Sequence, residues 1–481
     1  MDEESDIFPT GQLINQYHDH GHNFTPDGWS PIPASVRPLR EAHEPSRHTS
    51  SWKRAYIPGL VKHRLRLLVA VAVAVIMFCF SLSDTALHTS PASPWAKETT
   101  EDKETIVPTL ELKVERLVQK HRVDLNRSLV GALSPWQTAS AWVTSRQIIP
   151  DFAPRLGAIL GALAKGEVTQ ANINTAGTQL KLTLELEGQQ MVVFKPMFYE
   201  RSTFLALAGK LGRDRHNAEI ASFHLSRILN IRRVPLAVGR LLNLRGEVIP
   251  VATQSLMETF YVKDGRDCFY GACRHCTELS GVCTNQKLLE GVVILWLPPE
   301  ITLSKVRHPW RLDFKTAILN KFNESENSSH KTYCDVLRRL DVYRRHRFLL
   351  LDIMDTAVFD FLTGNNDRHH VEFTNDTDTG MLVMLDNGKS FGNPYYDEVA
   401  ILAPLQDCCM LRMSTWNSLQ LLRDGVLSRV LKEVLRSDPI HPVLIDSHFL
   451  ALDRRLKKVF QELDTCVQTT GLDNVLVDDG L

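Results

Sequence analysis

The chain has 481 residues, of which 43% are hydrophobic and 23% are charged, and its formal net charge at pH 7 is −1. This length suggests more than one domain, or one large two-lobed domain with appended segments. The near-neutral charge excludes a bulk electrostatic attraction to nucleic acid or to an anionic membrane surface, and no nucleic-acid partner is expected.

The first part of the chain has the pattern of a membrane anchor. Residues 1–61 are rich in Pro, His, Ser and charge, and are predicted to be a disordered tail. The uncharged run Leu67–Leu82 directly follows a short basic stretch. Since about 20 apolar residues cross a bilayer and basic residues stay cytoplasmic, residues 62–83 are predicted to be a single-pass type II signal anchor. Residues 84–109 then form a lumenal stem. The alternative is a signal peptide that is cleaved after a long leader.

The next segment predicts a β-hairpin. Leucines alternate with polar residues from Gln179 to Leu186, which is typical of a half-buried strand. A turn follows, and Met191–Lys195 forms a return strand that ends with Lys195. Further on, the apolar spacing predicts a helix over Asn217–Leu229 and a strand over Gly291–Leu297.

After residue 298 the pattern becomes mainly helical. Apolar residues at helical spacing predict a helix over Asp352–Leu362, and Gly364 suits its C-terminal cap. A strand-rich part with an N-terminal extension (110–297) thus precedes a helical part (298–481). The predicted fold class is α+β, with the two lobes of an atypical kinase-like fold.

Eight cysteines follow the apolar run, which fits disulfide bonding in an oxidising compartment. The sequence alone does not assign their pairing. Four of them are closely spaced as Cys-x4-Cys-x2-Cys-x6-Cys, for which a zinc site is the alternative. Asn-x-Ser/Thr sequons in the predicted lumenal body are candidate glycosylation sites. They are Asn126, Asn323, Asn327 and Asn375.

The stretches GNNDRHHVEF (364–373) and LDNGKSFG (385–392) carry the candidate chemistry. Phosphoryl transfer needs one carboxylate that orients the attacking hydroxyl and others that hold the metal ion on the nucleotide phosphates. Asp367 stands in the position of the catalytic-loop Asp, and Asp386 follows nineteen residues later, before Asn-Gly, in the position of the metal-binding Asp. Glycine after Asn387 is expected to let this loop turn tightly. Either motif alone is more often a surface turn, but the two in this order favour a phosphotransferase.

The strand-rich half offers matching parts. Lys195 is placed to neutralise nucleotide phosphates, Glu219 to pair with it and Asp214 to reach the metal ion. The segment Ile294, Leu295, Trp296 and Leu297 lies where a hinge between lobes would meet adenine, although an ordinary core strand is the alternative. No glycine-rich phosphate loop is present.

With these residues the chain resembles the secretory-pathway kinases called family with sequence similarity 20. The matching blocks lie within about residues 130–481 and are GTQLKL, VVFKPM, DRHNAEIASFHLSRIL, CFYGAC, DIMDTAVFDFLTGNNDRHH, LDNGKSFGNP, ILAPLQDCC and ALDRRL. HPW (308–310), STWN (414–417) and the two-residue gap between Cys273 and Cys276 resemble the glycosaminoglycan xylosylkinase branch. The segment Phe198–Arg213 departs from the family pattern.

The resemblance implies transfer of the ATP γ-phosphate to the 2-hydroxyl of xylose in the proteoglycan linkage region, with Mn²⁺ preferred and Mg²⁺ as the alternative. It implies a Golgi membrane location and a homo- or heterodimer within the family. A protein kinase acting on secreted Ser residues and a pseudokinase are the alternatives. The implied catalytic residue is Asp367, and the implied metal ligands are Asp386 and Asp214.

The resemblance also implies residue roles around the nucleotide and in the disulfides. The implied ATP-binding residues are Gln179, Lys195, Ile294, Leu295, Trp296, Leu297, Glu372 and Asp386, with Lys181 nearby and Glu219 paired with Lys195. The implied disulfides are Cys268–Cys283, Cys273–Cys276, Cys334–Cys408 and Cys409–Cys466. Trp310 and Trp416 are candidates for stacking on sugar, with core packing as the alternative.

Overall fold

The computed structural model describes residues 103–126, 133–204, 212–274, 276–311, 315–319, 332–376 and 379–480. All of them belong to one compact unit of the chain. The predicted tail (1–61) and anchor (62–83) lie outside the described residues, as do Asn323 and Asn327. Among the described helices, none has the length and apolar composition needed to cross a bilayer.

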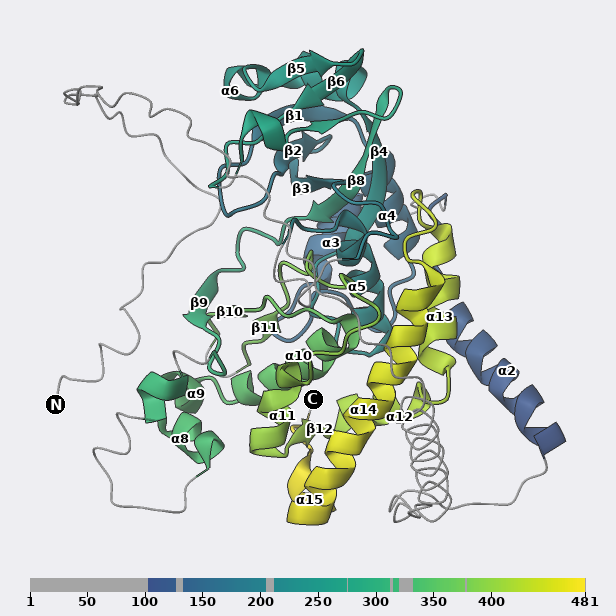
Figure 1. Cartoon of the computed structure of the whole chain (residues 1–481), viewed down its shortest axis with the longest axis vertical. Coiled ribbons are helices and arrows are strands. Elements are labelled where there is room, and N and C mark those ends of the chain that lie inside the picture. The colour runs from purple at the N-terminus through teal and green to yellow at the C-terminus, as the bar shows by residue number, and fades with distance from the viewer. Residues whose placement is uncertain are drawn as a thin grey trace, which may run out of the picture. The chain divides into compact units, whose positions relative to one another are not determined.

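A five-stranded antiparallel sheet forms the core of the N-terminal lobe (Figure 1). Its strands, in spatial order, are β1 (Val168–Ile173), β2 (Leu182–Leu186), β3 (Gln190–Pro196), β8 (Leu288–Leu295) and β4 (Ala237–Asn243). The β2 leucines are fully buried and the residues between them are half-buried, as the alternating pattern predicts. Lys195 lies near the end of β3, so the sheet fixes its position relative to the elements that pack against the sheet.

Strand ends differ from the predicted ones. β2 begins at Leu182 rather than Gln179, and β8 spans Leu288–Leu295 rather than Gly291–Leu297. The reason for the second difference is pairing, because β8 follows β4 from Leu288 opposite Asn243 to Ile294 opposite Ala237. Trp296 and Leu297 consequently lie beyond the strand.

Helices and a small sheet surround the N-terminal sheet. The helices are α2 (Lys103–His121), α3 (Pro135–Trp142), α4 (Leu156–Lys165), α5 (His216–Ile228) and α6 (Gln254–Met257), and the small sheet contains β5 (Phe260–Lys263), β6 (Arg266–Phe269) and β7 (Val282–Cys283). α2 begins within the segment that was predicted as a stem. α5 contacts β4 and β8, and most of its residues are buried. This packing fixes α5 against the sheet and so fixes Glu219 relative to β3.

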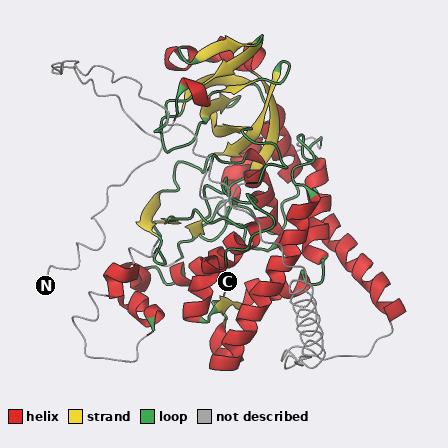
Figure 2. Cartoon of the chain, viewed as in Figure 1, coloured by secondary structure: helices red, strands yellow, loops and turns green. Residues whose placement is uncertain are grey.

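The C-terminal lobe is mainly helical, as Figure 2 shows. It contains α8 (Tyr333–Arg339), α9 (Asp341–Arg345), α10 (Leu349–Thr363), α11 (Ala403–Cys408), α12 (Met413–Leu421), α13 (Val426–Val434), α14 (Asp446–Thr470) and α15 (Leu472–Val475). A sheet of β11 (Leu382–Val383), β10 (His370–Thr374) and β9 (Leu303–Arg307) accompanies them, and β12 (Leu411–Arg412) pairs with β13 (Leu476–Val477). α10 is buried along its whole length, and Gly364 caps its C-terminal end. The φ of Gly364 is 73°, which is in the left-handed region that glycine adopts without strain.

A buried ion-pair network ties α10 to distant parts of the chain. The Asp352 carboxylate has no exposed surface and lies 2.8 Å from Arg146, 2.5 Å from Arg233 and 2.9 Å from Arg412. Burial alone would raise the pKa of Asp352, but the three guanidinium groups hold its pKa well below the usual range. Removing one member would leave buried charges without compensation.

We expect Asp352→Asn to lower the free energy of unfolding at pH 7 by about 3–5 kcal/mol. The native carboxylate stays ionised at pH values where the unfolded chain is already protonated. Stability from this group is therefore present above a pH of about 4 and is lost as the pH falls below it. Urea unfolding at pH 7 and at lower pH measures both effects. Equal stability of the variant and the wild type at pH 7 would contradict this role.

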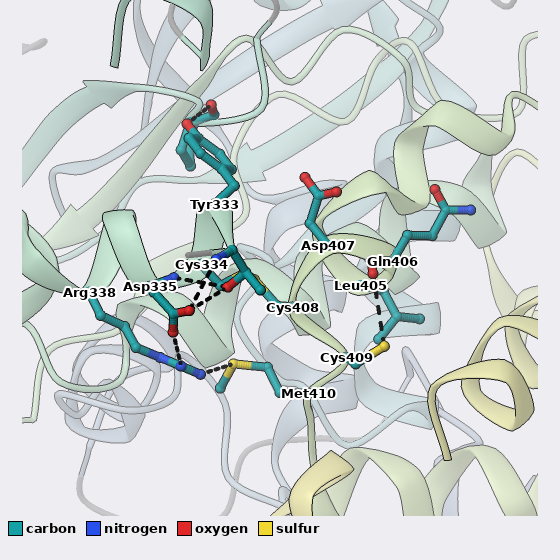
Figure 3. The surroundings of a disulfide bond; sticks show 12 residues. Tyr333, Cys334, Asp335, Arg338, Leu405, Gln406, Asp407, Cys408, Cys409 and Met410 are labelled. Atoms are coloured by element: carbon teal, nitrogen blue, oxygen red, sulfur yellow. Dashed lines mark hydrogen bonds and ion pairs between the residues drawn. A yellow bond between two sulfur atoms is a disulfide. The ribbon is translucent and has the colours of Figure 1, made fainter. Parts of the chain in front are cut away.

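The structure forms four disulfides, and they are the pairs that the resemblance implies. They are Cys268–Cys283, Cys273–Cys276, Cys334–Cys408 and Cys409–Cys466. The four closely spaced cysteines are thus bonded to each other rather than arranged around zinc. Figure 3 shows Cys334–Cys408, which joins α8 to the end of α11. Beside it Arg338 lies 3.3 Å from Asp335 and 3.5 Å from the Met410 sulfur.

The stabilisation by each disulfide is expected to follow the length of the chain segment that it closes. Cys334 and Cys408 are separated by 74 residues, whereas Cys273 and Cys276 are separated by 3. The chain-entropy estimate predicts a loss of about 4 kcal/mol for Cys334→Ser with Cys408→Ser, against about 1.5 kcal/mol for the short pair. Denaturant unfolding of the two double variants tests this order. A larger loss for the short pair would contradict it.

Candidate active site

Lys195 joins the predicted residues of the two lobes. Its Nζ lies 3.1 Å from Asp214, 2.7 Å from Glu219 and 2.8 Å from Asp386. The lysine comes from β3, Glu219 from the first turn of α5, Asp214 from the segment before α5, and Asp386 from the loop after β11. Residues 191 positions apart in sequence thus meet at one amine.

The charges in this cluster are strongly coupled. Burial would lower the pKa of Lys195, but the carboxylates, Asp386 first, raise its pKa well above the usual value. The Lys195 charge, in turn, holds the pKa of Asp386 below its usual range. Burial and the neighbouring Asp386 carboxylate, against the attraction of Lys195, raise the pKa of Asp214 to about 6. Lys389 Nζ adds a second positive charge 3.6 Å from Asp214, and the pKa of Asp214 is nevertheless raised.

These carboxylates fit a divalent cation. The Asp386 side chain is 73% exposed, whereas Asp214 is buried, and both carboxylates lie within 3.1 Å of the Lys195 amine. Two neighbouring carboxylates, one of them open to solvent, supply the oxygen ligands that a divalent cation prefers. Among the described residues no three His, Cys, Asp or Glu side chains already form a complete ligand set, so a metal ion would also need oxygens from nucleotide phosphates and water.

The Asp-Asn-Gly loop differs from the expected turn. The left-handed residue is Asp386, with a φ of 56°, and Gly388 is not left-handed. Gly388 is needed for a different reason: a Cβ there would lie 2.6 Å from Asp214 Cβ and Cγ. Its carbonyl also accepts a 2.7 Å hydrogen bond from the Arg215 N–H. The glycine therefore permits close approach of the loop to Asp214, and backbone strain falls on a predicted metal ligand.

Asp367 is held by its backbone in the loop after α10. Its N–H donates to Asn365 Oδ1 at 3.2 Å, and its carbonyl accepts from the His369 N–H at 2.8 Å and from His369 Nδ1 at 2.7 Å. The His370 ring packs against the His369 ring with centroids 4.5 Å apart. The Asp367 side chain is 41% exposed, so a substrate hydroxyl is able to reach it.

Arg368 links the two predicted loops, a role that the sequence analysis missed. It donates to the Leu385 carbonyl at 2.7 Å and to Asn387 Oδ1 at 2.9 Å, on either side of Asp386. Asp360 of α10 anchors the same guanidinium at 2.9 Å. The structure thereby brings the Asp367 and Asp386 loops together. A sequence signal existed: Asp360 lies between Phe359 and Phe361 in an apolar helix, and a buried carboxylate there needs a cationic partner.

The other predicted nucleotide-site residues lie in three places. Gln179 Oε1 lies 3.4 Å from the Asp214 N–H, and burial, followed by the Lys195 charge, lowers the pKa of Lys181, so both lie beside the cluster. Glu372 instead faces β9, where its carboxylate lies 3.0 Å from Lys305. The segment Ile294–Leu297 covers the end of β8 and the residues after it, and the Trp296 N–H donates to the Met191 carbonyl at 3.3 Å.

The two tryptophans proposed for sugar stacking are packed in the protein. Trp416 is 6% exposed and makes an edge contact with Phe460. Trp310 is half-buried, makes an edge contact with Tyr333 and donates to Asp407 at 2.8 Å. Core packing was the alternative to sugar stacking for both tryptophans, and it applies to Trp416.

The strand-rich lobe contains a Lys–Glu ion pair. The helical lobe contains a loop Asp and a second Asp that is able to bind a metal ion. Together these features define a kinase-like phosphotransferase. The profile described as Golgi casein kinase, C-terminal, Fam20 matches residues 134–475. The chain belongs to the Fam20 family.

Relatives named glycosaminoglycan xylosylkinase are similar over most of their length. The Danio rerio protein is 47% identical over 347 residues, which cover 72% of this chain and 83% of the relative. The Homo sapiens protein is 46% identical over 366 residues, which cover 76% and 88%. A human extracellular serine/threonine protein kinase, FAM20C, is 38% identical over 341 residues, which cover 68% and 56%.

Two solved structures share the fold. The structure of hydra Fam20 with sugar has a TM-score of 0.66 and 38% identity, and the match covers 73% of this chain and 100% of that one. The crystal structure of the Golgi casein kinase with Mn/ADP bound has a TM-score of 0.65 and 28% identity, with 81% and 96% covered. The prediction of a kinase-like Fam20 fold is confirmed.

Proposed function

We propose that this protein is a glycosaminoglycan xylosylkinase, an enzyme that transfers the γ-phosphate of ATP to the 2-hydroxyl of xylose in the proteoglycan linkage region. The observation that carries the phosphotransferase chemistry is the convergence of Asp214, Glu219 and Asp386 on the Lys195 amine. The choice of xylose as acceptor is supported by the 46% and 47% identity to proteins of that name.

The acceptor hydroxyl is oriented by the Asp367 carboxylate, which takes its proton as the oxygen attacks the γ-phosphorus. The new bond joins the acceptor oxygen to phosphorus, and the bond from phosphorus to the bridging oxygen breaks, so that ADP leaves. Lys195 binds nucleotide phosphates, and Glu219 keeps its amine directed toward them. Arg368 fixes the spacing of the Asp367 and Asp386 loops during this step.

Asp386 and Asp214 are the proposed metal ligands, with Mn²⁺ preferred and Mg²⁺ as the alternative. The Golgi casein kinase structure contains Mn and ADP, which supports this choice. When bound, the ion supplies positive charge that offsets the charge of the phosphates. Gln179, Lys181 and the segment Ile294–Leu297 are proposed to contact the nucleotide, and Glu372 to act from a greater distance because it pairs with Lys305.

The proposed location is the Golgi lumen, with a single N-terminal membrane span. Four disulfides in the described residues support an oxidising compartment. Asn126 and Asn375 are exposed, as glycan acceptors must be. A homo- or heterodimer within the family is proposed as well.

The test is acceptor choice by the purified protein with ATP and Mn²⁺. We expect phosphorylation of a galactosyl-xyloside, with the phosphate located on the xylose 2-hydroxyl by NMR, and almost no phosphorylation of casein. Phosphorylation of casein alone would favour a secretory Ser kinase. Transfer to neither acceptor, with nucleotide binding intact, would favour a pseudokinase.

A further inference from the structure

The loop of residues 174–181, between β1 and β2, carries two of the proposed nucleotide contacts, Gln179 and Lys181. Gln179 Oε1 lies 3.4 Å from the Asp214 N–H, which places the loop beside the proposed metal ligands. At its base the Asn174 N–H donates to the Lys181 carbonyl at 3.4 Å, but the tip of the loop is exposed. An exposed loop with few hydrogen bonds of its own keeps one position only if another part of the chain holds it.

The segment after β6 makes the contact that holds this loop. The Arg274 N–H donates to the Gly177 carbonyl, at the tip of the loop, at 3.3 Å. Nearby, the Cys276 sulfur and the buried Leu180 side chain lie against the same glycine. A Cβ at Gly271 would be 2.7 Å from that sulfur and 3.3 Å from Leu180 Cγ. One backbone hydrogen bond and one apolar contact therefore join the segment to the loop.

The small sheet gives this segment a fixed base. The segment directly follows β6, and Cys268 of β6 is bonded to Cys283 of β7. The sheet lies beside β1 (Figure 1), and the Thr253 N–H, just before α6, donates to the Ala171 carbonyl of β1 at 2.9 Å. The near end of the segment is thus anchored, and its far end depends on the next disulfide.

The Cys273–Cys276 disulfide fixes the part of the segment that touches the loop. The two cysteines flank Arg274 in the sequence Cys-Arg-His-Cys, and the Cys276 N–H also donates to the Cys273 carbonyl at 3.0 Å. Cys273 is buried and Cys276 is half-buried. The bond therefore restricts the backbone that presents the Arg274 N–H to Gly177, and breaking it would release this backbone.

This disulfide has little to contribute to the stability of the whole protein. Its cysteines are separated by 3 residues, and a bond that closes so short a segment removes little freedom from the unfolded chain. Cys334 and Cys408, separated by 74 residues, close a far longer segment. The effect of the short disulfide is therefore expected to be local, at its contact with the loop.

We propose that the Cys273–Cys276 disulfide positions the loop of residues 174–181 for contact with the nucleotide. A loop that is already held in its binding conformation does not lose further freedom when the ligand binds. Opening the disulfide leaves Lys195 and its ion pairs in place, so only the contacts made by the loop are weakened. This inference rests on the proposed function, which supplies ATP as the ligand, and adds a positioning element to it.

The first test is the double variant Cys273→Ser with Cys276→Ser. We expect Kd for ADP with Mn²⁺, measured by calorimetry, and KM for ATP to rise by about tenfold, while kcat and KM for galactosyl-xyloside stay unchanged. The matched control is Cys334→Ser with Cys408→Ser, which removes the disulfide between α8 and the end of α11. The control should lose more stability and keep wild-type nucleotide affinity. A general loosening of the fold does not produce these opposite orders.

The second test uses the wild-type protein and does not depend on activity. Dithiothreitol reduces a disulfide by giving it two electrons and two protons, so that the protein gains two thiols and the reagent becomes a cyclic disulfide. Because coupling between two equilibria is reciprocal, ADP with Mn²⁺ should lower the equilibrium ratio of reduced to oxidised Cys273–Cys276 by the same factor of about ten. Alkylation and peptide mass spectrometry measure this ratio, with Cys334–Cys408 as the internal reference.

The other outcomes contradict the inference in distinguishable ways. Wild-type nucleotide affinity in the Cys273 and Cys276 double variant, or a reduced fraction that does not respond to nucleotide, would refute the positioning role and leave the proposed function intact. An equal loss of nucleotide affinity in both double variants would assign the effect to general stability. If the short-pair variant does not fold, the wild-type redox measurement decides. If the wild type binds no nucleotide with Mn²⁺, the proposed function itself fails.

Discussion

Asp367→Asn is expected to lower the rate of phosphoryl transfer by about 10²–10⁴-fold, the range that a positioned general base contributes. The amide keeps the shape of the side chain but does not accept the proton of the acceptor hydroxyl. The loop should stay in place, because its hydrogen bonds to Asn365 and His369 involve the backbone of Asp367. Initial rates with galactosyl-xyloside, together with nucleotide affinity measured by calorimetry, test this expectation.

The control for this variant is Asp341→Asn. The Asp341 side chain is 37% exposed, close to the 41% of Asp367, and it pairs with Arg344 and Arg345 on its own helix. Its replacement should leave both transfer and nucleotide binding near the wild-type level. A wild-type rate in Asp367→Asn would remove this residue from the role of base. A parallel loss of nucleotide affinity would instead show that the loop had been displaced.

The parts of the site that sequence patterns predicted are those set by local structure. Alternation over β2 and the turn before β3 placed Lys195 on a return strand, and helical spacing placed Glu219 at the start of α5. Gly364 marked the end of α10 because a left-handed cap favours glycine. Each of these depends on neighbours within a few residues along the chain, which a single sequence displays.

The parts that were missed depend on partners far away in sequence. The length of β8 is set by its pairing with β4, and nothing within β8 itself marks Leu288 as its start. The Asp352 network joins residues 206 positions apart, from Arg146 to α10. Gly388 looked like a turn residue, but its role is to let the loop approach Asp214, which no local pattern reveals.

The contact between Asp360 and Arg368 is local in sequence, and yet it was missed. The eight residues from one to the other include the end of α10 and the turn at Gly364, so the contact is local in sequence. It was overlooked because the apolar stripe of the helix dominated the pattern. A carboxylate within such a stripe has a large desolvation cost, and the following arginine was the obvious partner. A charged residue within an apolar helix therefore indicates a partner of opposite charge, in the same way that a motif indicates a site.

Asp386→Asn is expected to abolish metal-dependent nucleotide binding and to lower transfer by about 10²–10³-fold, comparable to the loss of a major electrostatic contact in a transition state. Two effects act together. The variant removes the most exposed carboxylate of the cluster, and so the one most accessible to a cation. It also removes the group that contributes most to the raised pKa of Lys195, so the amine is held less firmly between Glu219 and Asp214.

Asp264→Asn is the matched control for this prediction. Asp264 has a φ of 51° and a side chain that is 73% exposed, so it shares both the left-handed backbone and the exposure of Asp386. It lies in the turn between β5 and β6, where asparagine suits a left-handed position equally well. Calorimetric titration of nucleotide with and without Mn²⁺ should show a metal-dependent signal in the control and none in Asp386→Asn. If Mn²⁺ strengthens nucleotide binding equally in both variants, the ion is held by other groups and Asp386 serves only to position Lys195.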